Sequence, residues 1–221
     1  MQIEVLNNVI INYTENDIDY IEDLSKQILL QGQKILNYFN LEKLDKPTYI
    51  YFYNNLGTFK EKAKTRNSTG IVPNWLCGWA STKPNRYEVH VLSYSEYIKT
   101  QSHENDTIED IITLVLHEFT HNCYDSYMFS NKNRKTLMWL HEALATTLSN
   151  QRNNLTISCS VDDLYNENQI AYHNYYTLGK YLLSNHNKEY ILKLISDYKY
   201  LKLETQNIYD NTRKWLNSLN K

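Results

Sequence analysis

The fold is decided by residues 106–121, which read DTIEDIITLVLHEFTH. Asp106, followed three positions later by Glu109, forms a capping-box pattern that marks the start of a helix. The apolar run IITLVL then leads directly to two histidines that are four positions apart. Together these signals predict a helix that carries His117 and His121 on one face.

The pentapeptide HEFTH, residues 117–121, has the spacing of a metal-binding helix. Residues four apart lie one turn above each other, so the imidazoles of His117 and His121 can reach one metal ion. Glu118 points about 100° away around the helix, where it can contact a water on the metal without binding the metal itself. The alternative is a pair of surface histidines, but the apolar run before His117 places both near a buried face.

A third ligand has to come from another part of the chain, because zinc at a catalytic site takes three protein ligands and leaves one position for water. The segment MWLHEALA, residues 138–145, predicts a second amphipathic helix that can fold back antiparallel and present Glu142 to the metal. His141 competes for the same role. Adjacent helix positions point about 100° apart, so only one of the two can face the metal.

HEFTH followed about twenty residues later by WLHEALATTLS resembles the gluzincin metallopeptidases, whose second helix typically reads W-L-x-E-G-L-A or W-L-N-E-G-F-A. The resemblance implies a Zn²⁺ ion held by His117, His121 and Glu142, with Glu118 as the general base. Ala143 stands where the family usually has Gly. No G-x-M-E-N segment of the aminopeptidase type is visible, which favours internal cleavage or a narrow substrate.

Two further segments extend the resemblance to peptidase-MA-like domains over most of the chain. Gly78-Trp79-Ala80 and the strand after it are similar to the family's edge strand, which implies that they bind an extended peptide substrate. YHNYYTLGKYL, residues 172–182, is similar to the family's tyrosine pattern, although Tyr175 stands where the family often has Gly. The resemblance implies that Tyr172 stabilises the tetrahedral intermediate, with His173 and Tyr176 as competitors for that role.

Strands first and helices second predict an α+β fold in one domain, with an α/β part over about 1–100 and a helical part over about 101–221. The expected form is a thermolysin-like zincin catalytic domain, in which a small N-terminal sheet has an edge strand over the active-site helix. The expected elements are a helix from Thr14 to about Asn40, a strand over TYIYFYNN after Pro47, a helix over Thr58–Arg66, a loop or irregular strand over Asn67–Asn85, a strand from Tyr87, and helices from Asp106, over Lys135–Gln151, over Asp162–Ser184 and over two shorter stretches to the end.

Composition excludes several other classes of protein. The formal net charge of −2, with no basic stripe, gives no reason to expect nucleic acid as a partner. No apolar run approaches the ~20 residues needed to cross a bilayer, and the first residues lack the basic region of a signal peptide, so a cytoplasmic protein is expected. Three cysteines without CxxC spacing predict free thiols, with Cys123 packed in the core.

The predicted function is zinc-dependent hydrolysis of a peptide or protein substrate. One alternative is a catalytically silent, zinc-stabilised peptide-binding module of the same fold, against which the intact Glu118 argues. The other is a toxin-like protease with a single protein target. His90, on the face of its strand opposite the apolar residues, is interpreted as a solvent- or cleft-facing side chain and not as a ligand. Oligomeric state is left open.

Overall fold

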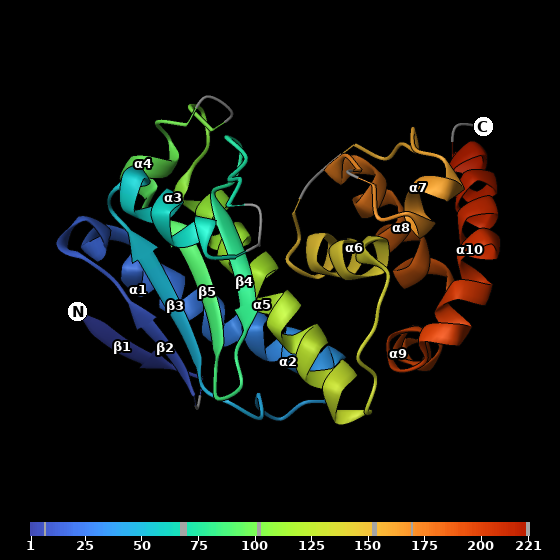
Figure 1. Ribbon diagram of the computed structural model, residues 1–221, viewed down its shortest axis with the longest axis horizontal. Helices are drawn as coiled ribbons and strands as arrows, with labels where there is room; N and C mark the ends of the chain where they lie inside the picture. The colour runs from blue at the N-terminus through green and yellow to red at the C-terminus, as the bar shows by residue number, and fades with distance from the viewer. Residues whose placement is uncertain (7, 67–69, 101–102, 152–153, 169, 220–221) are drawn as a thin grey trace.

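The computed structural model describes residues 1–221 except 7, 67–69, 101–102, 152–153, 169 and 220–221 (Figure 1). Within these residues five strands form one mixed sheet, and most of the helices follow it in the chain. In Figure 1 the sheet and the helix at residues 108–130 lie on one side, and the helices after residue 137 gather on the other. None of the described helices is both long and apolar enough to cross a membrane.

The sheet has the order β1 (Gln2–Val5), β2 (Val9–Asn12), β3 (Thr48–Tyr53), β5 (Tyr87–Leu92) and β4 (Gly78–Thr82). The central strands β2, β3 and β5 are parallel, while β1 and β4 run antiparallel to their neighbours at the two edges. Two differences from the sequence prediction stand out. The hairpin β1–β2 was not predicted, and β4 is a regular strand inside the segment predicted as a loop or irregular strand, of which residues 67–69 lie outside the described residues.

The helical run predicted from Thr14 is present but is not one regular helix. It passes through a 3₁₀ turn η1 (Glu15–Asp17), α1 (Ile18–Gln27), a π-helical turn η2 (Ile28–Gly32) and α2 (Gln33–Tyr38). Thr14 begins the run in a capping box with Asp17. The buried residues Leu24, Ile28 and Ile35 point it at the core.

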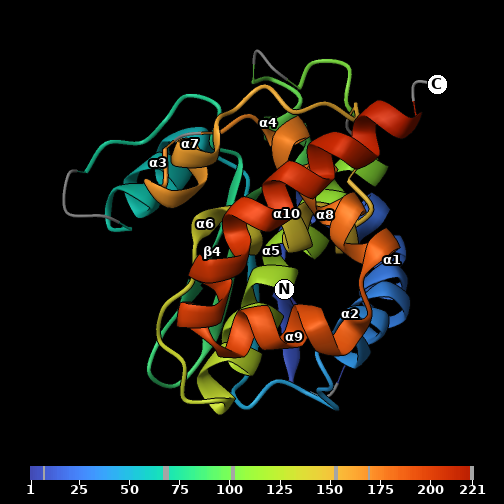
Figure 2. The same ribbon diagram turned by 90° about the vertical axis from the view of Figure 1, so that its right-hand side faces the viewer.

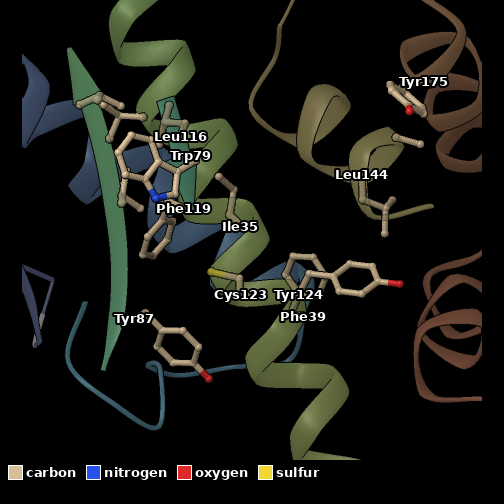
Figure 3. Close-up of a cluster of buried hydrophobic side chains, with 14 of the residues drawn as sticks. Ile35, Phe39, Trp79, Tyr87, Leu116, Phe119, Cys123, Tyr124, Leu144 and Tyr175 are labelled. Atoms are coloured by element: carbon tan, nitrogen blue, oxygen red, sulfur yellow. The ribbon is translucent and has the colours of Figure 1, made fainter. Parts of the chain in front are cut away.

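The long helix α5 (Ile108–Ser130) is the centre of the fold. It packs against β4 and β5 and also contacts α1, η2 and α2. Figure 3 shows Phe119, Cys123 and Tyr124 along this helix, with Phe39 beside Tyr124. The rings of Phe39 and Tyr124 meet edge to face at 6.2 Å, and Cys123 is fully buried, as predicted. The shorter helices α3 (Leu56–Lys64) and α4 (Tyr94–Tyr97) lie in the connections around the sheet.

The second half is built from α6 (Met138–Leu148), α7 (Val161–Tyr165), α8 (Tyr172–Asn185), α9 (Lys188–Ser196) and α10 (Tyr198–Leu219). Figure 2 shows α10 crossing in front of this group. The prediction of one helix over 162–184 was wrong, because α7 ends at Tyr165 and α8 begins at Tyr172. The prediction of two further helices is confirmed by α9 and α10, but α10 is longer than expected, with 22 residues.

Helices α6 and α8 approach each other very closely. A Cβ atom added to Gly179 on α8 would lie 2.4 Å from the carbonyl oxygen of Ala143 on α6 and 2.1 Å from Thr147 Oγ1. Only a residue without a side chain fits at this crossing. Because Ala143 is next to Glu142, Gly179 helps to fix the position of that carboxylate.

Candidate metal centre

Helix α5 presents HEFTH from its buried middle section. The helix begins one residue later than predicted: Thr107 is the N-cap, and Asp110 Oδ2 accepts hydrogen bonds from its backbone N–H at 2.8 Å and its hydroxyl at 2.9 Å. The predicted capping pair Asp106 and Glu109 was therefore wrong by one position. His117 and His121 keep only 2% and 7% of their surface exposed, so they are not a surface pair.

Helix α6 brings Glu142 to the same point. The two Nε2 atoms of His117 and His121 lie 3.1 Å apart. Glu142 Oε2 is 3.4 Å from His117 Nε2, and Oε1 is 3.6 Å from His121 Nε2. Among the described residues these three side chains form a group whose possible ligand atoms all lie within 4.8 Å of one another.

This donor set fits a divalent cation. Two zinc–ligand bonds of about 2.1 Å at a tetrahedral angle would hold their ligand atoms about 3.4 Å apart, close to the three separations observed. Glu142 Oε2 is buried and has no hydrogen-bond partner among the described residues. A buried carboxylate oxygen without a donor is costly, and a cation between the three side chains would offset that cost.

The protonation of two of the three side chains suits a metal site, whereas for His117 burial is outweighed by Glu142 and Glu118, which raise the pKa of this imidazole above its ordinary value. Burial opposes the charge of Glu142, but the imidazoles of His121 and His117 outweigh it and hold the pKa of this carboxyl at about 2. Burial and the nearby His141 lower the pKa of His121 well below its ordinary value. Glu142 is therefore ionised and His121 neutral at pH 7, which are the forms that bind metal.

Glu118 lies beside this cluster but does not belong to it. It is 6% exposed and reaches the neighbourhood of the Ala80 backbone on β4. Burial, together with the charge of Glu142, raises its pKa to about 7, against the opposing charges of His117 and Arg66. A carboxyl that titrates near neutral pH is matched to taking and returning a proton.

Of the three candidates for the oxyanion role, only Tyr172 faces the centre. Its ring lies 6.0 Å from that of His117, and burial together with the charges of Glu142 and Glu118 raises its pKa, so the hydroxyl stays protonated. The His173 ring is turned to Ser158 Oγ at 2.9 Å, while Tyr176 lies beneath the Lys180 ammonium.

His141, the competing third ligand, points elsewhere. Its Nε2 lies 3.5 Å from Asp125 Oδ1, and its ring is tilted against that of His121, with the ring centroids 4.1 Å apart. Asp125 also accepts a hydrogen bond of 2.6 Å from the hydroxyl of Thr82 on β4. His141 therefore supports the His121 ring from outside the His117, His121 and Glu142 group.

The three residues predicted to bind substrate have different surroundings. The Trp79 side chain is 4% exposed and stacks on His90 at 4.5 Å, so it faces away from the metal ligands. Gly78 packs against Leu114 on α5, and Ala80 lies next to Glu118. The Trp79 side chain therefore cannot contact a ligand bound near His117, His121 and Glu142, whereas the Ala80 main chain lies beside Glu118.

The prediction that the His90 side chain faces solvent or a cleft was wrong. Its side chain is 1% exposed, because Trp79 and Tyr51 stack on its two sides and the Tyr53 hydroxyl lies 2.8 Å from Nδ1. Helix α3 covers this face of the sheet through Phe59, which contacts both Tyr53 and Trp79.

Sequence reasoning missed Gln151, which follows the end of α6. Burial lowers the pKa of His117, and Gln151 adds a small contribution to the larger ones by which Glu142 and Glu118 raise it. Gln151 and Glu118 line one cavity with Tyr172. The side-chain oxygen of Gln151 is buried without a hydrogen-bond partner among the described residues. No local pattern marks such a residue, because its place depends on how the chain leaves α6.

Comparison with known proteins gives no match: no family model, no curated protein and no solved structure matches this chain.

Proposed function

We propose that this chain is a zinc-dependent peptidase of the gluzincin type, with a thermolysin-like zincin domain. The observation that carries the proposal is the convergence of His117, His121 and Glu142, with Glu118 beside them at a pKa of about 7. A purely structural site would need the three ligands but would have no use for the neighbouring base.

The residues divide the chemistry between them. When bound, Zn²⁺ would supply a Lewis acid that acidifies water and polarises a carbonyl group. Glu118 would take the proton of the attacking water and then deliver it to the leaving amine. The protonated hydroxyl of Tyr172 would donate a hydrogen bond to the oxyanion that develops on the carbonyl oxygen, an interaction worth about 3 kcal/mol.

The strand β4 would hold the substrate. It pairs with β5 on one side, and no other described strand pairs with its second side. An extended peptide can add to such an edge by main-chain hydrogen bonds, which give orientation with little dependence on side chains. Because Ala80 on β4 lies next to Glu118, a peptide bound there would have a backbone carbonyl close to the proposed base. This arrangement favours an endopeptidase or a narrow-specificity peptidase.

The test compares wild type with Glu118→Gln, which keeps the size of the side chain and removes its basicity. Purified protein is loaded with Zn²⁺ or stripped by a chelator, its metal content is measured, and a peptide mixture is digested and analysed by mass spectrometry. We expect one bound zinc in both proteins and at least a 100-fold lower rate of hydrolysis in the variant.

Three results would contradict the proposal. They are metal-independent hydrolysis, equal rates in the wild type and Glu118→Gln, and no hydrolysis by zinc-loaded wild type. In the last case, peptide binding that is the same in both proteins would identify the silent binding module.

A further inference from the structure

A cavity of about 700 Å³ adjoins the proposed catalytic groups. Glu118 and Tyr172 line one part of it, and Trp75, Gly78 and Glu109 line other parts. Its volume lies within the ~300–1,000 Å³ range of ligand pockets. A substrate whose scissile bond lay beside Glu118 would therefore have one of its side chains next to this cavity.

The cavity follows one face of the first half of α5. Asp110, Leu114 and Glu118 all line it, and their spacing of four residues places them along a single face of the helix. Gly78, the first residue of β4, also lines the cavity and lies against Leu114. The cavity therefore extends from Glu118 towards the N-terminus of α5 and the Gly78 end of β4.

The walls of this cavity are acidic. Asp106, Glu109 and Asp110 line it together with Glu118, and its described lining includes no lysine or arginine. The charge of Arg66 reaches Glu118, but Arg66 is not part of the lining. Carboxylates grouped around one cavity attract a cationic group and repel an anionic one.

Asp106, Glu109 and Asp110 differ in the number of hydrogen bonds that they accept from the protein. Asp110 caps α5, and Asp106 Oδ2 accepts from the Tyr97 hydroxyl at 2.7 Å and lies 2.6 Å from His103 Nδ1. The exposed Glu109 makes no hydrogen bond or ion pair with any described residue. Glu109 is therefore the carboxylate that is free to pair with a ligand.

We infer that this cavity is a specificity pocket for a lysine or arginine side chain of the substrate, an inference that rests on the proposed peptidase function. The aliphatic stem of such a side chain would lie on Leu114, and its cationic end would reach Glu109. Trp75, which is 47% exposed, also lines the cavity, and an aromatic ring can attract a cation bound beside it. Because the cavity lies at one end of β4, the preference applies to one side of the scissile bond only.

The test uses matched fluorescent peptides in which one residue at a time is varied. The varied residue occupies, in turn, each of the three positions before and the three positions after the scissile bond. The residue placed there is lysine, norleucine or glutamate, so that norleucine keeps the apolar stem without the charge. Both kcat/KM of zinc-loaded protein and equilibrium binding by fluorescence anisotropy to zinc-loaded and metal-free protein are measured. We expect lysine to exceed norleucine by about three- to tenfold at a position on one side, and glutamate to rank last.

Two variants assign the preference to the cavity. Glu109→Gln should reduce the lysine-to-norleucine ratio about threefold in both measurements. The matched control is Glu104→Gln, because Glu104 is exposed in the segment just before α5 and does not line the cavity. It removes the same charge from the protein and should leave the ratio unchanged.

The outcomes separate this inference from the proposed function. Hydrolysis without a lysine preference, or an equal effect of Glu109→Gln and Glu104→Gln, would overturn the specificity pocket and leave the peptidase intact. No hydrolysis of any peptide, combined with lysine-selective binding that Glu109→Gln weakens, would overturn the peptidase and leave a cation-selective pocket. Preference on both sides of the bond would overturn the placement at one end of β4.

Discussion

Two buried clusters in this molecule each combine histidine with glutamate, and they are bonded in opposite ways. In the sheet, the Glu88 carboxylate accepts hydrogen bonds from Arg86 Nε at 2.7 Å and Ser81 Oγ at 3.1 Å, and His90 Nε2 lies 3.2 Å from it. The Tyr53 hydroxyl completes the set at His90 Nδ1. Every polar atom of the Glu88–His90 pair therefore has a partner within the protein.

Where α5 meets α6, histidine and glutamate side chains are also buried together, but several of their polar atoms have no hydrogen-bond partner. Nδ1 of His117, Nδ1 of His121 and Oε2 of Glu142 are all buried without a hydrogen-bond partner among the described residues. Burying unpaired polar groups costs free energy, and a cation held by the two Nε2 atoms and Glu142 would offset that cost for Glu142 Oε2, although not for the two Nδ1 atoms. The comparison teaches that two clusters of similar composition can differ in their bonding, and that the incompletely bonded one is the candidate for binding a ligand.

The sharpest way to break this comparison is to change one carboxylate to its amide in each cluster. Glu142→Gln should lower zinc affinity by more than about 100-fold. Changing a residue that only hydrogen-bonds to a metal ligand already lowers metal affinity about 10- to 100-fold, and Glu142 is a proposed ligand itself. Glu88→Gln should keep full zinc binding and lose about 2 kcal/mol of unfolding free energy, because the buried His90 and the partly exposed Arg86 lose a charged acceptor. Competition with a chromogenic chelator and urea unfolding measure the two effects. Equal zinc loss in both variants would contradict the division.

Changing the crossing of α6 and α8 tests how far the candidate metal centre depends on the packing of the helix that carries Glu142. Gly179→Ala should lower the free energy of unfolding by about 2 kcal/mol, because its new methyl group overlaps the Ala143 carbonyl oxygen. We also expect weaker zinc binding, since α6 must move with Glu142. Lys180→Ala, at the next position, is the control and should change neither quantity by a comparable amount. Tight zinc binding by a destabilised Gly179→Ala protein would separate the crossing from the site.

Acid should weaken the sheet cluster in a defined pH window. Burial holds the pKa of His90 at about 4, below its ordinary value of 6.5, so the unfolded chain takes up this proton first. The resulting stability is complete above pH 6.5 and is lost as the pH falls towards 4. Between pH 7 and 4.5 metal-free wild type should lose on the order of 2 kcal/mol more than His90→Phe, as measured by urea unfolding. Parallel pH curves for the two proteins would show that His90 does not titrate in this way.

Removing one tyrosine hydroxyl at each of the two clusters should have the smallest effects. Tyr53→Phe should lower the free energy of unfolding by about 1 kcal/mol, because His90 Nδ1 loses its partner, and should not affect zinc binding. Tyr172→Phe should leave stability unchanged, since no described residue bonds to its hydroxyl, and should slow hydrolysis. Thermal unfolding and peptide cleavage distinguish the two variants. A stability loss in Tyr172→Phe that matched Tyr53→Phe would assign Tyr172 to the structure.

Several features of the fold followed from short-range patterns. The apolar run before His117 and the spacing of the two histidines were enough to place both on one helix, because helical contacts join residues three and four apart. Helix boundaries were less accurate. The N-cap of α5 is Thr107 and not Asp106, since adjacent polar residues compete for a cap and the geometry of the first turn decides between them.

Other features depended on contacts between distant segments. The alternation in β5 placed His90 opposite Val89 and Val91, but only the folded chain shows that α3 and Trp79 cover that face. The acidic cavity beside Glu118 is likewise formed by α5, the loop before β4 and the start of α8, which no local pattern connects.

The sequence by itself determined which residues could form the candidate centre: two histidines one helical turn apart, a glutamate between them, and Glu142 or His141 on a second helix. The tertiary structure decided between the last two, turning Glu142 to the imidazoles and His141 to Asp125. The physical reason is that periodicity fixes the angle between neighbouring side chains on one helix, whereas the rotation of that helix is fixed only by what it packs against. For α6 that contact is the close crossing at Gly179.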